Sequence, residues 1–157
     1  AGVLAAGSEP TAGVAAALLV HGTGGTTATL PAQGGTVALD LVIDSTVATN
    51  DFFVRLGMVE PNVVEIQTIT PGLFDQTDGA LGWMNRRYRE FYSTGMFGGT
   101  WTTGLAPGHY VAATITLQIA PAPGTHEVKV LDAVYAVDGV GLLPMSRGQP
   151  ITIVVGE

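Results

Sequence analysis

Apolar residues at every second position are the feature that most restricts how this 157-residue chain can fold. Residues 37–43 carry valine, leucine or isoleucine at each odd position, and residues 113–119 carry alanine, isoleucine or leucine at odd positions with threonine and glutamine in between. Similar alternation occurs in residues 52–58, 64–66, 128–130 and 151–155. Because successive side chains of a strand point to opposite sides, this pattern predicts strands that bury one face.

Turn-forming pairs separate these segments, among them Gly34-Gly35, Pro107-Gly108 and Asp138-Gly139. Many short strands with one apolar face predict an all-β fold, a two-sheet antiparallel β-sandwich of jelly-roll type. We expect at least about seven antiparallel strands within residues 14–157. The residues expected to be buried between the sheets are Leu39, Leu41, Val54, Leu56, Val64, Ile66, Ile115, Leu117, Ile151 and Ile153.

Two apolar segments lie at the start of the chain, Val3-Leu4 and Val14–Val20, and a polar break at residues 8–10 separates them. Residues 1–13 form an N-terminal extension ahead of the predicted sandwich. Burying a large apolar side chain stabilises a protein by about 1.5–3 kcal/mol, and segments left in water lose this stabilisation. One hypothesis is that the region is a donor strand for a neighbouring subunit. The residues that would insert are Val3, Leu4, Val14, Leu18 and Val20. The alternative is that residues 14–20 form an ordinary first strand of their own sandwich.

The segment 79–92 fits two structures equally well. Leu81, Met84, Tyr88 and Phe91 have the spacing of an amphipathic helix, and the same residues also permit a strand. Aromatic and arginine side chains, which are enriched in protein interfaces, gather in this segment and shortly after it. The candidate partner-binding residues are Trp83, Arg87, Tyr88, Arg89, Tyr92 and Trp101. Alternatively, the aromatic residues fill one end of the sandwich or form a platform for a glycan.

The charge balance restricts the partners. With 6 Lys and Arg against 13 Asp and Glu, the formal net charge is −7, so a nucleic-acid partner is not expected. No apolar run approaches the roughly 18 residues of a membrane span. The chain begins with Ala1 rather than methionine and is rich in threonine and glycine, with one lysine. These features predict an extracellular or cell-surface protein from which a signal peptide has been removed.

Catalytic chemistry is not expected. The chain lacks cysteine, its serines lack the G-x-S-x-G context, and its three histidines are far apart in the sequence. We expect these histidines at the surface or at strand ends. No cofactor is predicted, although Asp75 and Asp78 are weak candidates for calcium ligands, since a full calcium loop needs more carboxylates.

Several segments resemble strand motifs of cohesin modules, the β-sandwich partners of dockerins in cellulosomes. Residues 60–72 are similar to the D-P-x-V-L-E-φ strand, where φ is apolar, although Val59-Glu60 replaces the Tyr-Asp of the family. Residues 34–41 are similar to the G-x-x-V-x-V-x-V strand, residues 112–117 to the ATI-x-F strand, and residues 130–139 to a late φ-x-D-A-x-x-x-D-x-G turn. The resemblance covers roughly residues 14–157 and implies a cohesin-like, extracellular binding module. The dockerin-contacting positions do not align residue by residue, so none is assigned by resemblance.

Three functions follow as hypotheses. We favour a non-catalytic structural protein that assembles with copies of itself, as in a filament or surface layer, through strand addition between sandwiches. The first alternative is a cohesin module that binds a dockerin partner. The second alternative is a carbohydrate-binding sandwich.

Overall fold

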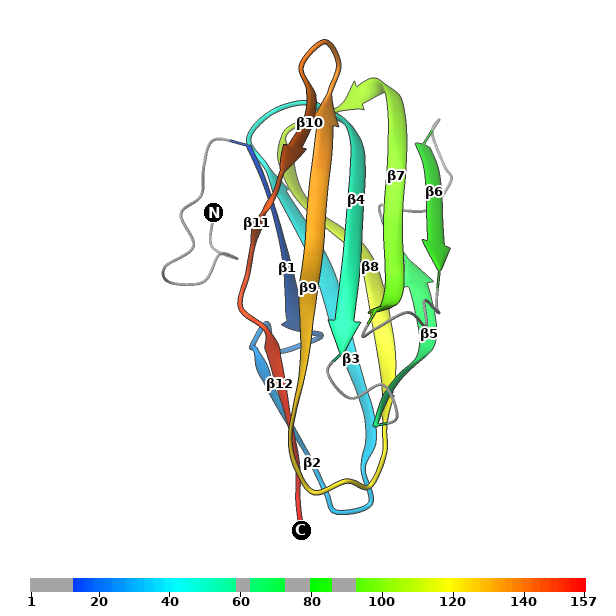
Figure 1. Ribbon diagram of the computed structural model, residues 1–157, viewed down its shortest axis with the longest axis vertical. Coiled ribbons are helices and arrows are strands. Elements are labelled where there is room, and N and C mark those ends of the chain that lie inside the picture. The colour runs from blue at the N-terminus through cyan, green and yellow to red at the C-terminus, as the bar shows by residue number, and fades with distance from the viewer. Residues whose placement is uncertain (1–12, 59–62, 73–79, 86–92) are drawn as a thin grey trace.

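The computed structural model describes residues 13–58, 63–72, 80–85 and 93–157, which form two β-sheets packed face to face (Figure 1). The first sheet has the order β11-β1-β3-β8-β5, and the second has the order β2-β12-β9-β4-β7-β6, with β10 paired to β9. In the first sheet the strands are β11 (Ser146–Arg147), β1 (Val14–Val20), β3 (Gly35–Ser45), β8 (Gly108–Ile119) and β5 (Val64–Pro71). In the second they are β2 (Thr27–Leu30), β12 (Ile151–Val155), β9 (Gly124–Val137), β4 (Thr49–Met58), β7 (Ser93–Leu105), β6 (Ala80–Asn85) and β10 (Gly141–Pro144). The predicted all-β sandwich is confirmed.

The core lies between the two sheets and consists of the alternating apolar residues. All ten residues predicted to be buried are in it, and the most exposed of them, Ile66, has 7% of its surface accessible. In β3, for example, Leu39, Leu41 and Ile43 have no exposed surface, while the intervening Asp40 and Asp44 face outward. The alternation therefore identified the inner faces of β3, β4, β5, β8 and β12 correctly.

The sheets are mixed rather than purely antiparallel. Most neighbouring strands are antiparallel, but β1 runs parallel to β11, and β2 runs parallel to β12. The first two strands of the chain therefore lie beside the last two, one pair in each sheet. This pairing joins segments that are more than 100 residues apart, so hairpin turns, which give antiparallel neighbours, do not set its direction.

Strand β1 belongs to its own sandwich, which corrects part of the donor-strand hypothesis. It pairs along its whole length with β3, and Val14 and Leu18 are buried in the core of the same molecule. Val20 is half-buried and packs against that core. These three side chains are therefore committed to intramolecular packing, because pairing with β3 makes β1 a strand of the first sheet and turns them toward the core between the sheets. Val3 and Leu4 lie outside the described residues, and their donation to a neighbour stays a prediction.

The ambiguous segment after residue 79 contains a strand where the structure describes it. Residues 80–85 form β6, which pairs antiparallel with β7, so the helical alternative is wrong for these six residues. Pairing with β7 gives the backbone N–H and C=O groups of β6 partners in the sheet. A helix this short, without such support, is only marginally stable. Residues 86–92 lie outside the described residues.

Candidate protein-binding surface

The outer side of the second sheet carries a surface built from β4 and β9. Phe52, Val54 and Leu56 point into the core, so the alternating Phe53 and Arg55 point outward and are partly exposed. The strand register places Phe53 opposite Val134 and Arg55 opposite Asp132. We call the surface formed by Phe53, Arg55, Lys129, Asp132 and Val134 the β4–β9 face.

Ion pairs define the charge of this face. The Arg55 guanidinium binds the Asp132 carboxylate across the two strands, and Lys129 Nζ lies 3.7 Å from Glu127 Oε1. The Asp132 side chain is 60% exposed, so the Arg55 pair is a surface pair worth at most about 1 kcal/mol to folding. The pair places one positive and one negative charge beside the apolar Phe53–Val134 pair.

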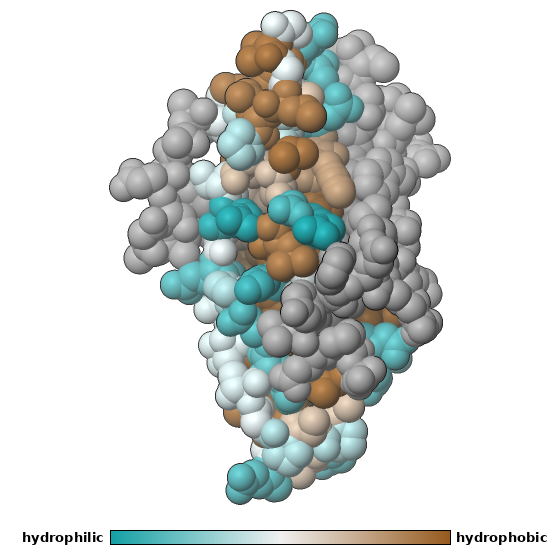
Figure 2. All heavy atoms as spheres, viewed as in Figure 1, coloured by the Kyte–Doolittle hydropathy of each residue, from teal (hydrophilic) through white to brown (hydrophobic). Residues whose placement is uncertain are grey.

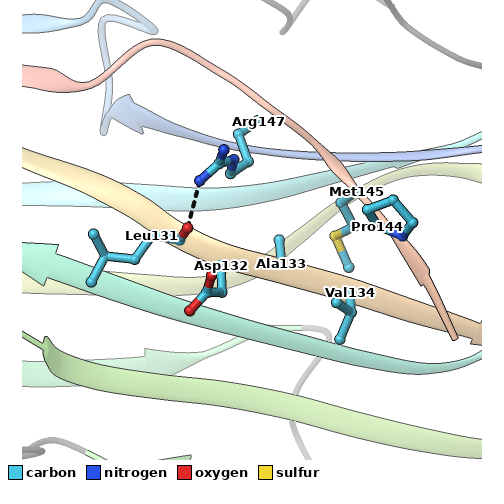
Figure 3. A pocket seen from close by; sticks show the side chains of 7 residues that line it. All are labelled: Leu131, Asp132, Ala133, Val134, Pro144, Met145 and Arg147. Carbon is cyan, nitrogen blue, oxygen red and sulfur yellow. Dashed lines mark hydrogen bonds between the residues drawn. The ribbon is translucent and has the colours of Figure 1, made fainter.

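A shallow hollow of about 230 Å³ adjoins the β4–β9 face (Figure 3). It forms because β12 pairs with β9 only up to Val128, and β10 pairs with β9 from Val134 onward. In this gap the Met145 backbone N–H donates to Ala133 O at 2.9 Å, and the Arg147 guanidinium donates to Leu131 O. The residues that line the hollow are Leu131, Asp132, Ala133, Val134, Pro144, Met145 and Arg147.

The β9–β10 hairpin extends the apolar part of this surface. Figure 2 shows hydrophobic residues gathered at the end of the molecule where Figure 1 places this hairpin. Val140 is 66% exposed and Leu142 is 74% exposed, and Val111, on the other sheet, is the third exposed large hydrophobic residue among those whose burial is described. Such exposure carries a solvation cost unless a partner covers the residues.

The predicted aromatic and arginine residues are only partly described. The register places Trp83 of β6 opposite Gly98, and Gly98 is itself opposite Phe53. Trp101 of β7 is opposite Ala80. Trp83 thus stands at the same level of the sheet as the β4–β9 face. Arg87, Tyr88, Arg89 and Tyr92 lie outside the described residues, so their role stays a prediction.

Sequence reasoning missed the residues of the β4–β9 face as a group. Arg55 and Asp132 are 77 residues apart, and only the pairing of β4 with β9 brings them together. A usable signal was nevertheless present, because Phe53 is a large apolar residue at a position that the alternation assigns to the outside.

The histidines form a second polar arrangement on the first sheet. His21 Nδ1 lies 3.0 Å from Asp40 Oδ1, and the Thr114 hydroxyl donates to the same oxygen at 2.8 Å. His109 Nδ1 lies 2.6 Å from Asp44 Oδ1. The order Thr–Asp–His leaves the hydroxyl bonded to the carboxylate, whereas nucleophilic catalysis needs the hydroxyl bonded to the imidazole. His126 is buried near the start of β9, where its Nε2 lies 2.7 Å from Ala122 O.

Within the described residues, no group of three or more His, Asp or Glu side chains could hold a metal ion. The calcium candidates Asp75 and Asp78 lie outside those ranges. The described part of the chain also contains no helix that is long and apolar enough to cross a membrane.

Comparison with known proteins shows which solved structures have a similar fold. No family model and no curated protein matches the sequence. Among solved structures, the chain is similar to a non-cellulosomal cohesin from Archaeoglobus fulgidus, with 14% identity, a TM-score of 0.64 and 93% of each chain covered. It is also similar to a cohesin module of a Clostridium perfringens family 33 glycoside hydrolase, with 8% identity, a TM-score of 0.65, and 94% of this chain and 99% of that one covered.

A third similar structure is a type I cohesin–dockerin complex from Clostridium thermocellum, with 14% identity and a TM-score of 0.63. The match covers 94% of this chain and 98% of the chain in that complex. The fold of this chain is therefore cohesin-like over nearly its whole length, which confirms the fold inferred from the strand motifs.

Proposed function

We propose that this chain is a non-catalytic protein-binding module that binds a dockerin-type partner outside the cell. The observation that carries the proposal is the cohesin-like fold over more than nine-tenths of the chain, since several similar structures are complexes of a cohesin with a dockerin. This reading replaces self-assembly through residues 14–20 as the favoured function, because those residues pack within their own sandwich.

The β4–β9 face supports this proposal by its chemistry. Aromatic and arginine side chains beside an apolar centre provide most of the binding energy in protein interfaces. Phe53 and Val134 supply the apolar centre, and Arg55 and Asp132 supply charges of both signs. On the first sheet, by contrast, threonines and the two His–Asp pairs face outward, and Tyr110 of β8 packs against the core and donates its hydroxyl to Ala106 O. We therefore assign the partner to the β4–β9 face.

Binding to purified dockerins tests the proposal. We would immobilise the full chain and titrate type I and type II dockerin modules, including any encoded beside this chain, by surface plasmon resonance. We expect saturable binding to at least one dockerin, and the Kd should rise at least about tenfold in Phe53→Ala and in Arg55→Glu. Both substitutions remove groups that point away from the core, so the fold should survive.

The matched control is Val111→Ala, because Val111 is exposed on the opposite sheet. It should leave the Kd within about twofold. Equal weakening by all three substitutions would contradict the assignment to the β4–β9 face. If no dockerin binds while soluble oligosaccharides do, the carbohydrate-binding alternative replaces the proposal.

A further inference from the structure

Strand β1 is apolar on both of its faces. Its residues, Val14–Val20, include no polar side chain, whereas a strand with one face in water normally alternates apolar and polar residues. The residues that it contributes to the core alternate with Ala15, Ala17 and Leu19, which therefore point to the outer side of the first sheet. A continuous apolar run of this kind is typical of strands that are covered on both sides.

Accessibility on this outer side rises from β1 toward β8. The strand register places Ala17 beside Val42 of β3, and Val42 beside Val111 of β8. Along this row 1%, 2% and 41% of the residue surface is accessible, although none of the three belongs to the core cluster between the sheets. A side chain that points outward from an uncovered sheet keeps an accessible surface, as Val111 does. The outer side of β1 and the adjoining part of β3 is therefore covered, and the cover ends before β8.

The neighbouring row gives the same order and adds an unpaired oxygen. Ala15 is buried, Asp44 beside it in β3 is partly exposed, and His109 beside Asp44 in β8 is exposed. His109 Nδ1 contacts Asp44 Oδ1, but Asp44 Oδ2 is buried and has no hydrogen-bond partner among the described residues. A buried carboxylate oxygen normally accepts a hydrogen bond, so we expect the cover to bring a donor to it.

No described strand supplies this cover. Every described strand belongs to one of the two sheets, and the second sheet packs against the inner side of the first. Ser146, the neighbour of Ala15 in β11, has a small side chain, and the Arg147 guanidinium binds Leu131 O of the second sheet. The covered area includes the start of β1, so it adjoins the point where residues 1–12 join the sandwich.

We propose that residues 1–12 fold back over the outer side of β1 and β3 in the same molecule, with Val3 and Leu4 packed against Ala17 and Val42. Val3 and Leu4 are the two large aliphatic side chains of this segment. Packing them here removes the same apolar surface from water as donation to a neighbouring subunit would, without the entropic cost of association. The cover lies on the first sheet, so the proposal does not depend on the dockerin assignment to the β4–β9 face.

The connecting chain is long enough for this arrangement. The Gly13 N–H donates to Thr46 Oγ1 at 2.8 Å, and the Thr46 N–H donates to Gly13 O at 2.9 Å, which fixes where the segment leaves the sheet. Ala17 lies four residues further along the chain, which is about 13 Å along a strand. The eight residues 5–12 span up to about 27 Å when extended, so they have the length to reverse direction and bring Leu4 to Ala17.

Thiol labelling of the full chain tests the proposal. The chain has no cysteine, so Val42→Cys, Ala17→Cys and Val111→Cys each carry a single thiol. Under native conditions we expect a maleimide to modify the first two at least about tenfold more slowly than the third. Adding Val3→Ser and Leu4→Ser to the Val42→Cys chain should raise its labelling rate at least about tenfold, because the cover loses its apolar contacts. Equal rates at the three positions would show that the outer side of β1 is uncovered.

The matched control adds Ala1→Ser and Gly2→Ser to the Val42→Cys chain. These changes place two hydroxyls in the same segment without removing a large apolar side chain, so the rate should stay within about twofold. An unchanged circular dichroism spectrum shows that the sandwich persists in each variant. A cover from the same molecule makes the rate independent of protein concentration, whereas a cover from a neighbour gives faster labelling on dilution. A rate that rises on dilution, or that Val3→Ser and Leu4→Ser leave unchanged, would overturn the proposal.

Discussion

Replacing Leu41 with alanine is expected to lower the free energy of unfolding by about 2–5 kcal/mol. Leu41 has no exposed surface and lies in the middle of β3, paired with Leu18 on one side and Ala113 on the other. The substitution removes buried apolar contacts and leaves a cavity. Because β1 and β8 hold their register on both sides, the neighbouring side chains cannot close the cavity fully.

Urea denaturation followed by circular dichroism measures this effect. The control is Thr116→Ala in β8, where the side chain points outward and only the strand preference changes, by less than about 1 kcal/mol. The m-value should stay constant in both variants if only native-state stability changes. A cost for Leu41→Ala as small as that of the control would show that the core is not packed as described.

Replacing Gly34 with alanine is expected to cost about 3 kcal/mol or more, for two separate reasons. Gly34 has a φ of +74°, in the left-handed region that disfavours residues with a Cβ. A Cβ at this position would also lie 2.3 Å from the backbone oxygen of Ile119. Because that oxygen ends β8, the clash forces the turn before β3 away from the sheet.

Gly139→Ala separates these two causes. Gly139 has a similar φ of +82°, but a Cβ there would meet no atom within 4 Å. This variant should therefore lose only the conformational part, about 1–2 kcal/mol. Denaturant unfolding of both variants gives the comparison. Equal losses would mean that the turn before β3 moves freely and that the contact with Ile119 has no energetic consequence.

The main core strands of this protein and their inward faces could be predicted from local sequence, whereas β2, β7, β10 and β11 were not predicted. Alternation decides which side chains share a face. A strand with one apolar face must turn that face toward the core, because a shift by one residue would expose it to solvent. This is why residues such as Leu39 and Ile153 were assigned to the core correctly. Where two periods fit the same residues, as in 79–92, local sequence gave no decision, and the pairing of β6 with β7 made it for residues 80–85.

Only the tertiary structure decided which distant segments meet. The parallel pairs β1–β11 and β2–β12, the burial of Val14 and Leu18 in their own sandwich, and the Arg55–Asp132 pair all join residues far apart in the chain. Nothing in a local pattern encodes such contacts, because they result from the order in which strands fill the two sheets. The sequence by itself therefore determined the main core strands and their buried faces, and its strand motifs indicated the cohesin-like fold. The tertiary structure determined the β4–β9 face, because that face depends on which strand lies next to β9.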